Sequence, residues 1–184
     1  MKKLYTMLLL VISLCTASCS DWLDVSPSNQ VNGDKLFEIG DGYRNALNGI
    51  YLNLGTSSMY GQTMSWGFMD AIAQYYKTDN GSNFIPKTSA YYKSAKFQFE
   101  DSDVKTFISN IWSVSYNNIA NCNNLILNVS EASPSVFKEG EFEKNMIWGE
   151  ALALRAFMHF DLLRLFAPAI SKDDGKSYIP YVEV

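Results

Sequence analysis

The sequence predicts an all-α protein made of tetratricopeptide-like helical hairpins, an α-α superhelix with one long irregular loop between its second and third helices. Apolar residues recur at three- and four-residue spacings in four separate segments. Residues of the kind that end helices, such as Gly55 and Pro168, follow two of these segments. The third and fourth segments begin about 38 residues apart, near the period of tetratricopeptide hairpins.

The first helix is expected over Asp41 to Leu54. Asp41 can cap its N-terminus, and Gly55 is placed to end it. Its apolar face comprises Tyr43, Ala46, Leu47, Ile50, Tyr51 and Leu54. A second helix is expected from about Met64 to Tyr76. Its inward side chains are expected to be Trp66, Met69, Ile72 and Ala73.

An irregular stretch is expected from Lys77 to Asp103. The Asp79-Asn80-Gly81 tripeptide is a turn signal, and Pro86 blocks helix formation. Long stretches of this kind within a compact domain are often functional.

The third helix is expected from Ser102 or Asp103 to about Val129, with a row of asparagines along one face. The row comprises Asn110, Asn117, Asn121, Asn124 and Asn128. Asparagine is a poor helix former, so the row requires an explanation. It is either a polar seam that hydrogen-bonds to neighbouring elements or a ladder that faces a ligand. Trp112, on the same helix, is expected in the core.

The fourth helix is expected over Glu141 to Ala167. It is apolar on nearly every side, which predicts burial. Asp161 and Arg164 lie one turn apart and can pair. His159 is the only histidine of the chain, and it is interpreted as a packing residue with one hydrogen bond. From Ser171 onward a loop or a short extended segment is expected.

Catalytic and metal-binding patterns are absent from the sequence. It contains no nucleophile elbow, no HExxH motif and no glycine-rich phosphate loop. A carboxylate pair for glycoside hydrolysis would have to come from five residues whose spacing selects no pair. These are Asp70, Asp79, Glu100, Asp101 and Asp103. The segment "KDDGKS" lacks the spacing of a calcium loop and is interpreted as a solvated turn. No cofactor and no metal are expected.

The N-terminus has the order of a secretory signal. Lys2 and Lys3 precede a short apolar run, and the small residues of "TAS" lead to Cys19. A cysteine directly after small residues indicates a bacterial lipoprotein signal at residues 1–18. Cys19 would then carry the lipid, and residues 19–35 would form the anchor and tether. The alternative is a plain secreted protein with a free Cys19. Cys122 is the other remaining cysteine, so neither a disulfide framework nor a cysteine zinc site is expected.

The charge of the chain argues against nucleic acid as a partner. The formal net charge is −4, and removal of the two lysines with the signal would make the chain more acidic. Binding to phosphates requires a basic patch.

Four segments in order resemble the SusD/RagB family of outer-membrane lipoproteins. "CSDWLDVSPSNQV" resembles the start of the mature family chain, and "LFEIGDGYRNALNGIYLNL" resembles its first helix. "IWSVSYNNIANCNNLI" is similar to a family helix with Trp, Tyr, Ile and Asn in that order. "GEALALRAFMHFDLLRLFAPA" resembles the most recognisable helix, although the family more often has Tyr where His159 stands.

The resemblance implies a helical, tetratricopeptide-like domain over residues 36–184 and no catalysis. It implies a lipid-anchored protein on the outer face of the outer membrane. Such a protein captures glycans, or in some members peptides, and passes them to a TonB-dependent SusC-like transporter. Family members are usually longer, so this chain resembles an N-terminal portion. Exposed faces of the fourth helix would then promote aggregation.

Sugar contacts are expected in the irregular stretch after the second helix. A pyranose stacks its C–H face on an aromatic ring, and its hydroxyls need amide or carboxylate partners. The candidate residues are Tyr76, Asn83, Phe84, Tyr91 and Tyr92. Alternatively, these rings fold the loop onto the helices. Two other functions stay open, a surface glycan hydrolase and a helical-repeat adaptor for a protein partner or peptide.

Overall fold

The computed structural model describes residues 33–78 and 85–183, and the chain divides into two units at residues 36 and 37. The first unit contributes the short helix α2 (Gly33–Leu36). The expected signal peptide, Cys19 and most of the tether lie outside the described residues. All regular secondary structure in the two described ranges is helical. No helix there is long and apolar enough to cross a membrane.

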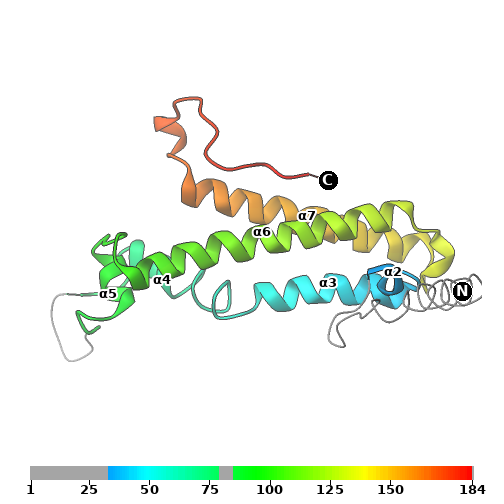
Figure 1. The fold of residues 1–184 in the computed structure, drawn as a ribbon, viewed down its shortest axis with the longest axis horizontal. Helices are drawn as coiled ribbons and strands as arrows, with labels where there is room; N and C mark the ends of the chain where they lie inside the picture. The colour runs from blue at the N-terminus through cyan, green and yellow to red at the C-terminus, as the bar shows by residue number, and fades with distance from the viewer. Residues whose placement is uncertain (1–32, 79–84, 184) are drawn as a thin grey trace, which may run out of the picture. The chain divides into compact units, whose positions relative to one another are not determined.

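The second unit is organised around a hairpin of two long helices, α6 (Ser102–Glu131) and α7 (Glu141–Phe166). Figure 1 shows α7 running back along α6 after a connection that holds the 3₁₀ turn η1 (Pro134–Val136). Helix α3 (Gly40–Leu54) packs against both. The observed bounds confirm the predicted first, third and fourth helices to within two residues.

The core lies between these three helices. Its buried side chains include Leu47 of α3, Ile119 and Leu125 of α6, and Leu162 of α7. Cys122 is also fully buried there, and burial raises the pKa of its thiol to about 11. The thiol therefore stays protonated and acts as a small apolar core group.

Polar side chains join the helices at the margins of the core. The Arg44 guanidinium of α3 donates two hydrogen bonds to one carboxylate oxygen of Glu143 on α7, at 3.1 and 2.7 Å. The Tyr60 hydroxyl donates to Asp161 at 2.5 Å, and Arg164 donates to the other oxygen of Asp161 at 2.6 Å. The predicted pairing of Asp161 with Arg164 is confirmed.

The substitution Arg44→Met is expected to lower stability at neutral pH and to reduce its dependence on acid pH. Arg44 is the main reason why the pKa of Glu143 lies below its usual value. The ionised carboxylate stabilises the fold above the ordinary glutamate pKa, and this contribution is lost as the pH falls through the lowered value. Urea unfolding at about pH 7 and pH 3 should show the gap between wild type and variant narrowing in acid. A gap of constant size would contradict this role for Arg44.

The predicted second helix is wrong in its length, because only α4 (Phe68–Ile72) forms. The preceding residues 55–67 fold into successive turns, where the Ser65 hydroxyl donates to the carbonyl oxygens of Tyr60 and Gln62. Gly67 permits this path, since a Cβ there would lie 2.8 Å from the Gln62 carbonyl oxygen. At the other end Gln74 adopts a left-handed φ of 63°, which stops the helix before Tyr75.

Within the predicted irregular stretch the chain forms a short helix, α5 (Ala90–Ala95). The Ser89 hydroxyl caps it by accepting from the backbone N–H of Tyr91. Lys93 fixes α5 to the start of α6, because its ammonium lies 2.9 Å from both Asp101 and Asp103. Helix α5 ends where Phe97 enters the left-handed region, at φ 57°.

Phe97→Gly is expected to give a more stable protein than Phe97→Ala, by about 1 kcal/mol, because a left-handed residue with a Cβ is strained. Phe97 makes an edge-on contact with Phe99, with ring centroids 6.0 Å apart. Both variants lose this contact, so the difference between them reports the cost of placing a residue with a Cβ in the left-handed conformation. Thermal unfolding of the two variants measures the difference. Equal stabilities would contradict strain at this position.

Two sequence expectations about α6 and α7 need correction. Asn110, Asn117, Asn121 and Asn124 are exposed, and Asn121 donates along the helix to Asn117 at 3.3 Å. The polar seam is formed by other asparagines, since Asn53 of α3 donates to the buried Asn118, and Asn123 bonds to α7. Helix α7 is not buried on all sides. Its exposed apolar row comprises Phe142, Trp148, Leu152, Phe157, Phe160 and Leu163.

Candidate functional site

Aromatic side chains surround a small hollow beside α4 and α5, which we call the aromatic hollow. Its volume is about 100 Å³, and it is lined by Trp66, Gly67, Tyr76, Ile85 and Tyr91. The structure thus brings together two of the sequence-predicted ligand residues, Tyr76 and Tyr91. It adds Trp66, which was predicted to be in the core and is instead 57% exposed.

Helix α5 and the start of α6 hold Tyr91 in position. The Tyr91 ring stacks on Phe107 of α6, with centroids 5.3 Å apart and planes inclined by 23°. Its hydroxyl oxygen accepts a hydrogen bond from the Gln62 amide at 2.7 Å. Phe107 in turn contacts the buried Phe68 of α4. Packing therefore sets the ring orientation of Tyr91. Because its hydroxyl oxygen acts as the acceptor for Gln62, the hydroxyl group can donate its proton to a ligand.

The turns before and after α4 bring Trp66 and Tyr76 to the same place. The Tyr76 hydroxyl donates to the backbone carbonyl oxygen of Trp66. Burial and the nearby Asp70 carboxylate raise the pKa of Tyr76, so its hydroxyl stays neutral and continues to donate. Helical periodicity placed Trp66 on an inward face, but Trp66 precedes α4. The glycines at positions 61 and 67 were the sequence signal that turns, not helix, hold this residue.

The other predicted residues lie elsewhere. Tyr92 is half-buried on α5, and its ring faces Lys96, whose ammonium lies 5.7 Å from the ring centroid. It is not among the residues that line the hollow. Asn83, Phe84 and the lipidation candidate Cys19 lie outside the described residues.

The aromatic hollow has the chemistry of a surface subsite for an uncharged, hydroxylated ligand. The exposed Trp66 indole supplies a flat apolar face. Gln62, Asp70 and the Tyr91 hydroxyl, all partly accessible, supply hydrogen-bonding groups around it. Pockets that enclose drug-sized ligands measure about 300–1,000 Å³. At its size the hollow accommodates the edge of one ring and leaves the rest of a ligand on the surface.

Comparison with known protein families identifies the chain. A family model described as starch-binding and associating with the outer membrane matches residues 21–183. The chain belongs to the SusD-like family. No curated protein and no solved structure matches the chain.

SusD-like membership confirms the resemblance drawn from the four sequence motifs, and it covers nearly the whole chain. The family is one of binding proteins associated with the outer membrane and with SusC-type uptake, not one of enzymes. An exposed aromatic surface with polar neighbours is consistent with such a binding role.

Ion pairs hold some of the candidate carboxylates of this SusD-like chain. Lys93 holds Asp101 and Lys105 holds Glu100, and these ion pairs lower the pKa of both carboxyl groups. A glycosidase acid needs the opposite, a carboxyl group with a raised pKa. Asp70 lies near Tyr76, and Asp79 falls outside the described residues. Glu100 and Asp101 therefore lack the raised pKa that such an acid requires.

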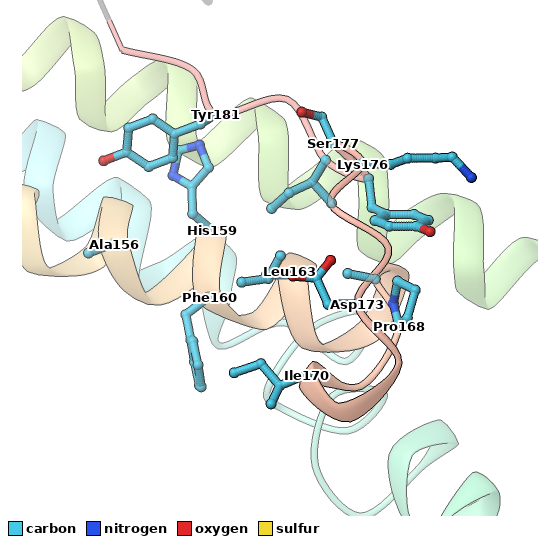
Figure 2. Close-up of a pocket in the computed structure, with 13 residues that line it drawn as sticks. Ala156, His159, Phe160, Leu163, Pro168, Ile170, Asp173, Lys176, Ser177 and Tyr181 are labelled. Atoms are coloured by element: carbon cyan, nitrogen blue, oxygen red, sulfur yellow. The ribbon is translucent and has the colours of Figure 1, made fainter.

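A second, larger hollow of about 540 Å³ lies between α7 and the segment that follows it. Figure 2 shows Phe160 and Leu163 of α7 on one side, with Pro168, Ile170 and Tyr181 from the later segment around them. Its lining is chiefly apolar, and it continues the exposed apolar row of α7. Such a surface is more typical of a packing or protein contact than of a sugar site.

Proposed function

We propose that this SusD-like protein captures neutral oligosaccharides at the cell surface and passes them to a TonB-dependent SusC-like transporter. The observation that carries the proposal is the exposed Trp66 beside Tyr76 and Tyr91 in a chain of a starch-binding family. A sugar ring stacks on the indole, and its hydroxyls bond to Gln62, Asp70 and the Tyr91 hydroxyl. Asn83, Phe84 and Tyr92 are proposed to extend the contact along the ligand.

The proposed location of the protein is supported by its N-terminal sequence and its family. Cys19 carries the lipid that holds the chain in the outer membrane, facing the exterior. Two or more acyl chains make such an attachment stable. The α6–α7 hairpin and α3 are proposed to be part of a tetratricopeptide-like superhelix that positions the aromatic hollow above the transporter.

A second function, a helical-repeat adaptor for a protein or peptide, is favoured by one specific observation. Helix α7 exposes a continuous apolar row that includes Phe157, Phe160 and Leu163. Apolar patches of this kind mark protein contacts. An adaptor of this type would bind through α7 and would leave the aromatic hollow unused.

Affinity electrophoresis in gels that contain neutral polysaccharides, such as starch, tests the proposed function. Retardation of the chain by one polysaccharide, without release of reducing ends, supports capture without hydrolysis. Release of reducing ends would indicate a hydrolase. Migration that no neutral polysaccharide alters, together with retention of the transporter or a peptide in pull-downs, would support the adaptor and contradict glycan capture.

A further inference from the structure

The only histidine of the sequence is buried, and it lies where the segment that follows α7 returns to the helical hairpin. His159 on α7 is 4% exposed. Residues 178–183, which we call the strap, pass over it toward the middle of α6 and α7. Figure 2 shows the Tyr181 ring against the imidazole, and the two ring centroids lie 4.4 Å apart.

Hydrogen bonds at both ring nitrogens define the protonation state of His159. Its Nδ1 lies 2.9 Å from the Arg155 carbonyl oxygen, which can only accept, so Nδ1 carries a proton. Its Nε2 lies 3.1 Å from the backbone nitrogen of Val182, which can only donate. Nε2 must therefore present its lone pair, and the imidazole that binds the strap is neutral.

The remaining contacts of the strap surround this bond. The Asn123 amide donates to the Val182 carbonyl oxygen at 3.2 Å, and Arg155 donates to the Asn123 side-chain oxygen at 3.0 Å. The Tyr116 hydroxyl donates to the Pro180 carbonyl oxygen at 2.8 Å. Both backbone groups of Val182 are therefore bonded. Its N–H donates to His159 of α7, and its carbonyl oxygen accepts from Asn123 of α6.

We propose that the strap is a pH-sensitive latch, docked while His159 is neutral and released when His159 is protonated. A proton on Nε2 would point at the Val182 N–H, so two donors would face each other at hydrogen-bond distance. The new positive charge would also lie four residues from Arg155 on the same helix, a spacing at which like charges repel.

The other titratable and charged groups around His159 do not supply the same switch. Tyr116 of α6 faces the imidazole edge to face, and burial raises its pKa, so its hydroxyl stays protonated. Glu183 of the strap lies 3.7 Å from Arg155 and is 58% exposed. Asp173 and Lys176 line the larger hollow together with His159 and Tyr181. A control variant must therefore distinguish the contribution of Glu183 to strap release from that of His159.

Release of the strap would change the larger hollow. Tyr178, Ile179 and Tyr181 form one of its walls, and all three lie in the strap. In acid this wall would move away, and His159, which the Tyr181 ring covers, would gain exposure. The inference does not depend on the proposed function, because it concerns contacts at the opposite side of α7 from α3 and does not involve the aromatic hollow.

Nuclear magnetic resonance on the full chain tests the latch between pH 8 and pH 5. Because the chain has a single histidine, its side-chain ¹⁵N signals report the tautomer and protonation of His159 directly. We expect Nδ1–H at pH 8. Backbone order parameters of the strap should then fall from about 0.85 to below about 0.6 as the imidazole protonates. The midpoint of this fall should coincide with that of His159 protonation.

Variants separate the latch from other causes. In His159→Gln the order of the strap should be the same at both pH values. In Glu183→Gln the release should persist with the wild-type midpoint. The proposal is overturned if the wild-type strap keeps its order while His159 protonates, if His159→Gln retains the pH-dependent release, or if Glu183→Gln abolishes it. The wild-type comparison of midpoints decides the matter even if a variant fails to fold.

Discussion

Trp66→Ala is expected to weaken binding of a neutral oligosaccharide by about 30-fold or more, since truncating a tryptophan that anchors a ligand costs about 2 kcal/mol or more. Trp66 is more than half exposed and precedes α4 in a turn. Its ring is therefore available to a ligand and contributes little to the core. The backbone carbonyl that accepts from Tyr76 stays in the variant. Binding should fall while the melting temperature changes little.

The matched control is Phe142→Ala. Phe142 is 68% exposed in the first turn of α7, which adjoins the end of α6, whereas the aromatic hollow lies beside the start of α6. Removing this ring takes away a similar exposed apolar surface without touching the hollow. Isothermal titration calorimetry of both variants should show a loss only for Trp66→Ala. Equal losses would point to nonspecific contact, and an unchanged Trp66→Ala would exclude the hollow as the sugar site.

Ile119→Ala is expected to lower the free energy of unfolding by about 2–5 kcal/mol, the range for truncating a buried aliphatic side chain. Ile119 is fully buried on α6, in the core that α3 and α7 share. The cavity would lie where the three long helices meet, so all of them would lose contacts. Since domains are stable by only about 5–15 kcal/mol, this loss is a large fraction of the total.

Two further variants calibrate this result. Ile119→Val removes one methyl group and should cost about 0.5–1.5 kcal/mol. Leu52→Ala on α3 removes a side chain that is 76% exposed and should change stability by less than about 0.5 kcal/mol. Urea unfolding of the three variants measures their free energies of unfolding and so ranks the three losses. A loss for Leu52→Ala as large as that for Ile119→Ala would contradict the assigned core.

The long helices could be predicted because their signals are local and repeated. In α3 and α6, apolar residues recur over several turns, and Pro168 and Gly55 mark ends that the structure places within two residues. The interpretation of His159 as a packing residue is confirmed by its burial, but the expectation of a single hydrogen bond is wrong, because both ring nitrogens are bonded. Its second hydrogen bond, to Val182, joins residues 23 positions apart, and no local pattern could have indicated it.

The segment around α4 could not be predicted, because there the turns override the helical period. Met64 to Tyr76 has helical spacing, but the chain satisfies its backbone with turn hydrogen bonds, such as that from Met64 to the Met59 carbonyl oxygen. This difference moves Trp66 from the core to the surface. The candidate site was therefore only half predicted: Tyr76 and Tyr91 were named for their chemistry, whereas the most exposed ring was missed.

The same limit applies to the asparagines of α6. Spacing showed that five of them align, and in the structure four of the five are exposed, while Asn128 is partly buried. Spacing could not show which asparagines would contact other elements. Asn118 and Asn123 do so because they lie at the edge of the buried face, where α3 and α7 approach.

The most direct test of the account is to map a bound neutral oligosaccharide on the whole chain by nuclear magnetic resonance. Titration with a ligand that retards the chain in affinity gels should shift the indole N–H of Trp66 first. The amide of Gln62 and the backbone of Tyr91 should shift with the same saturation curve, while α7 stays unchanged. Shifts confined to Phe160, Leu163 and Tyr181 in the larger hollow, or to the asparagine face of α6, would contradict the assignment of the aromatic hollow as the glycan-binding site.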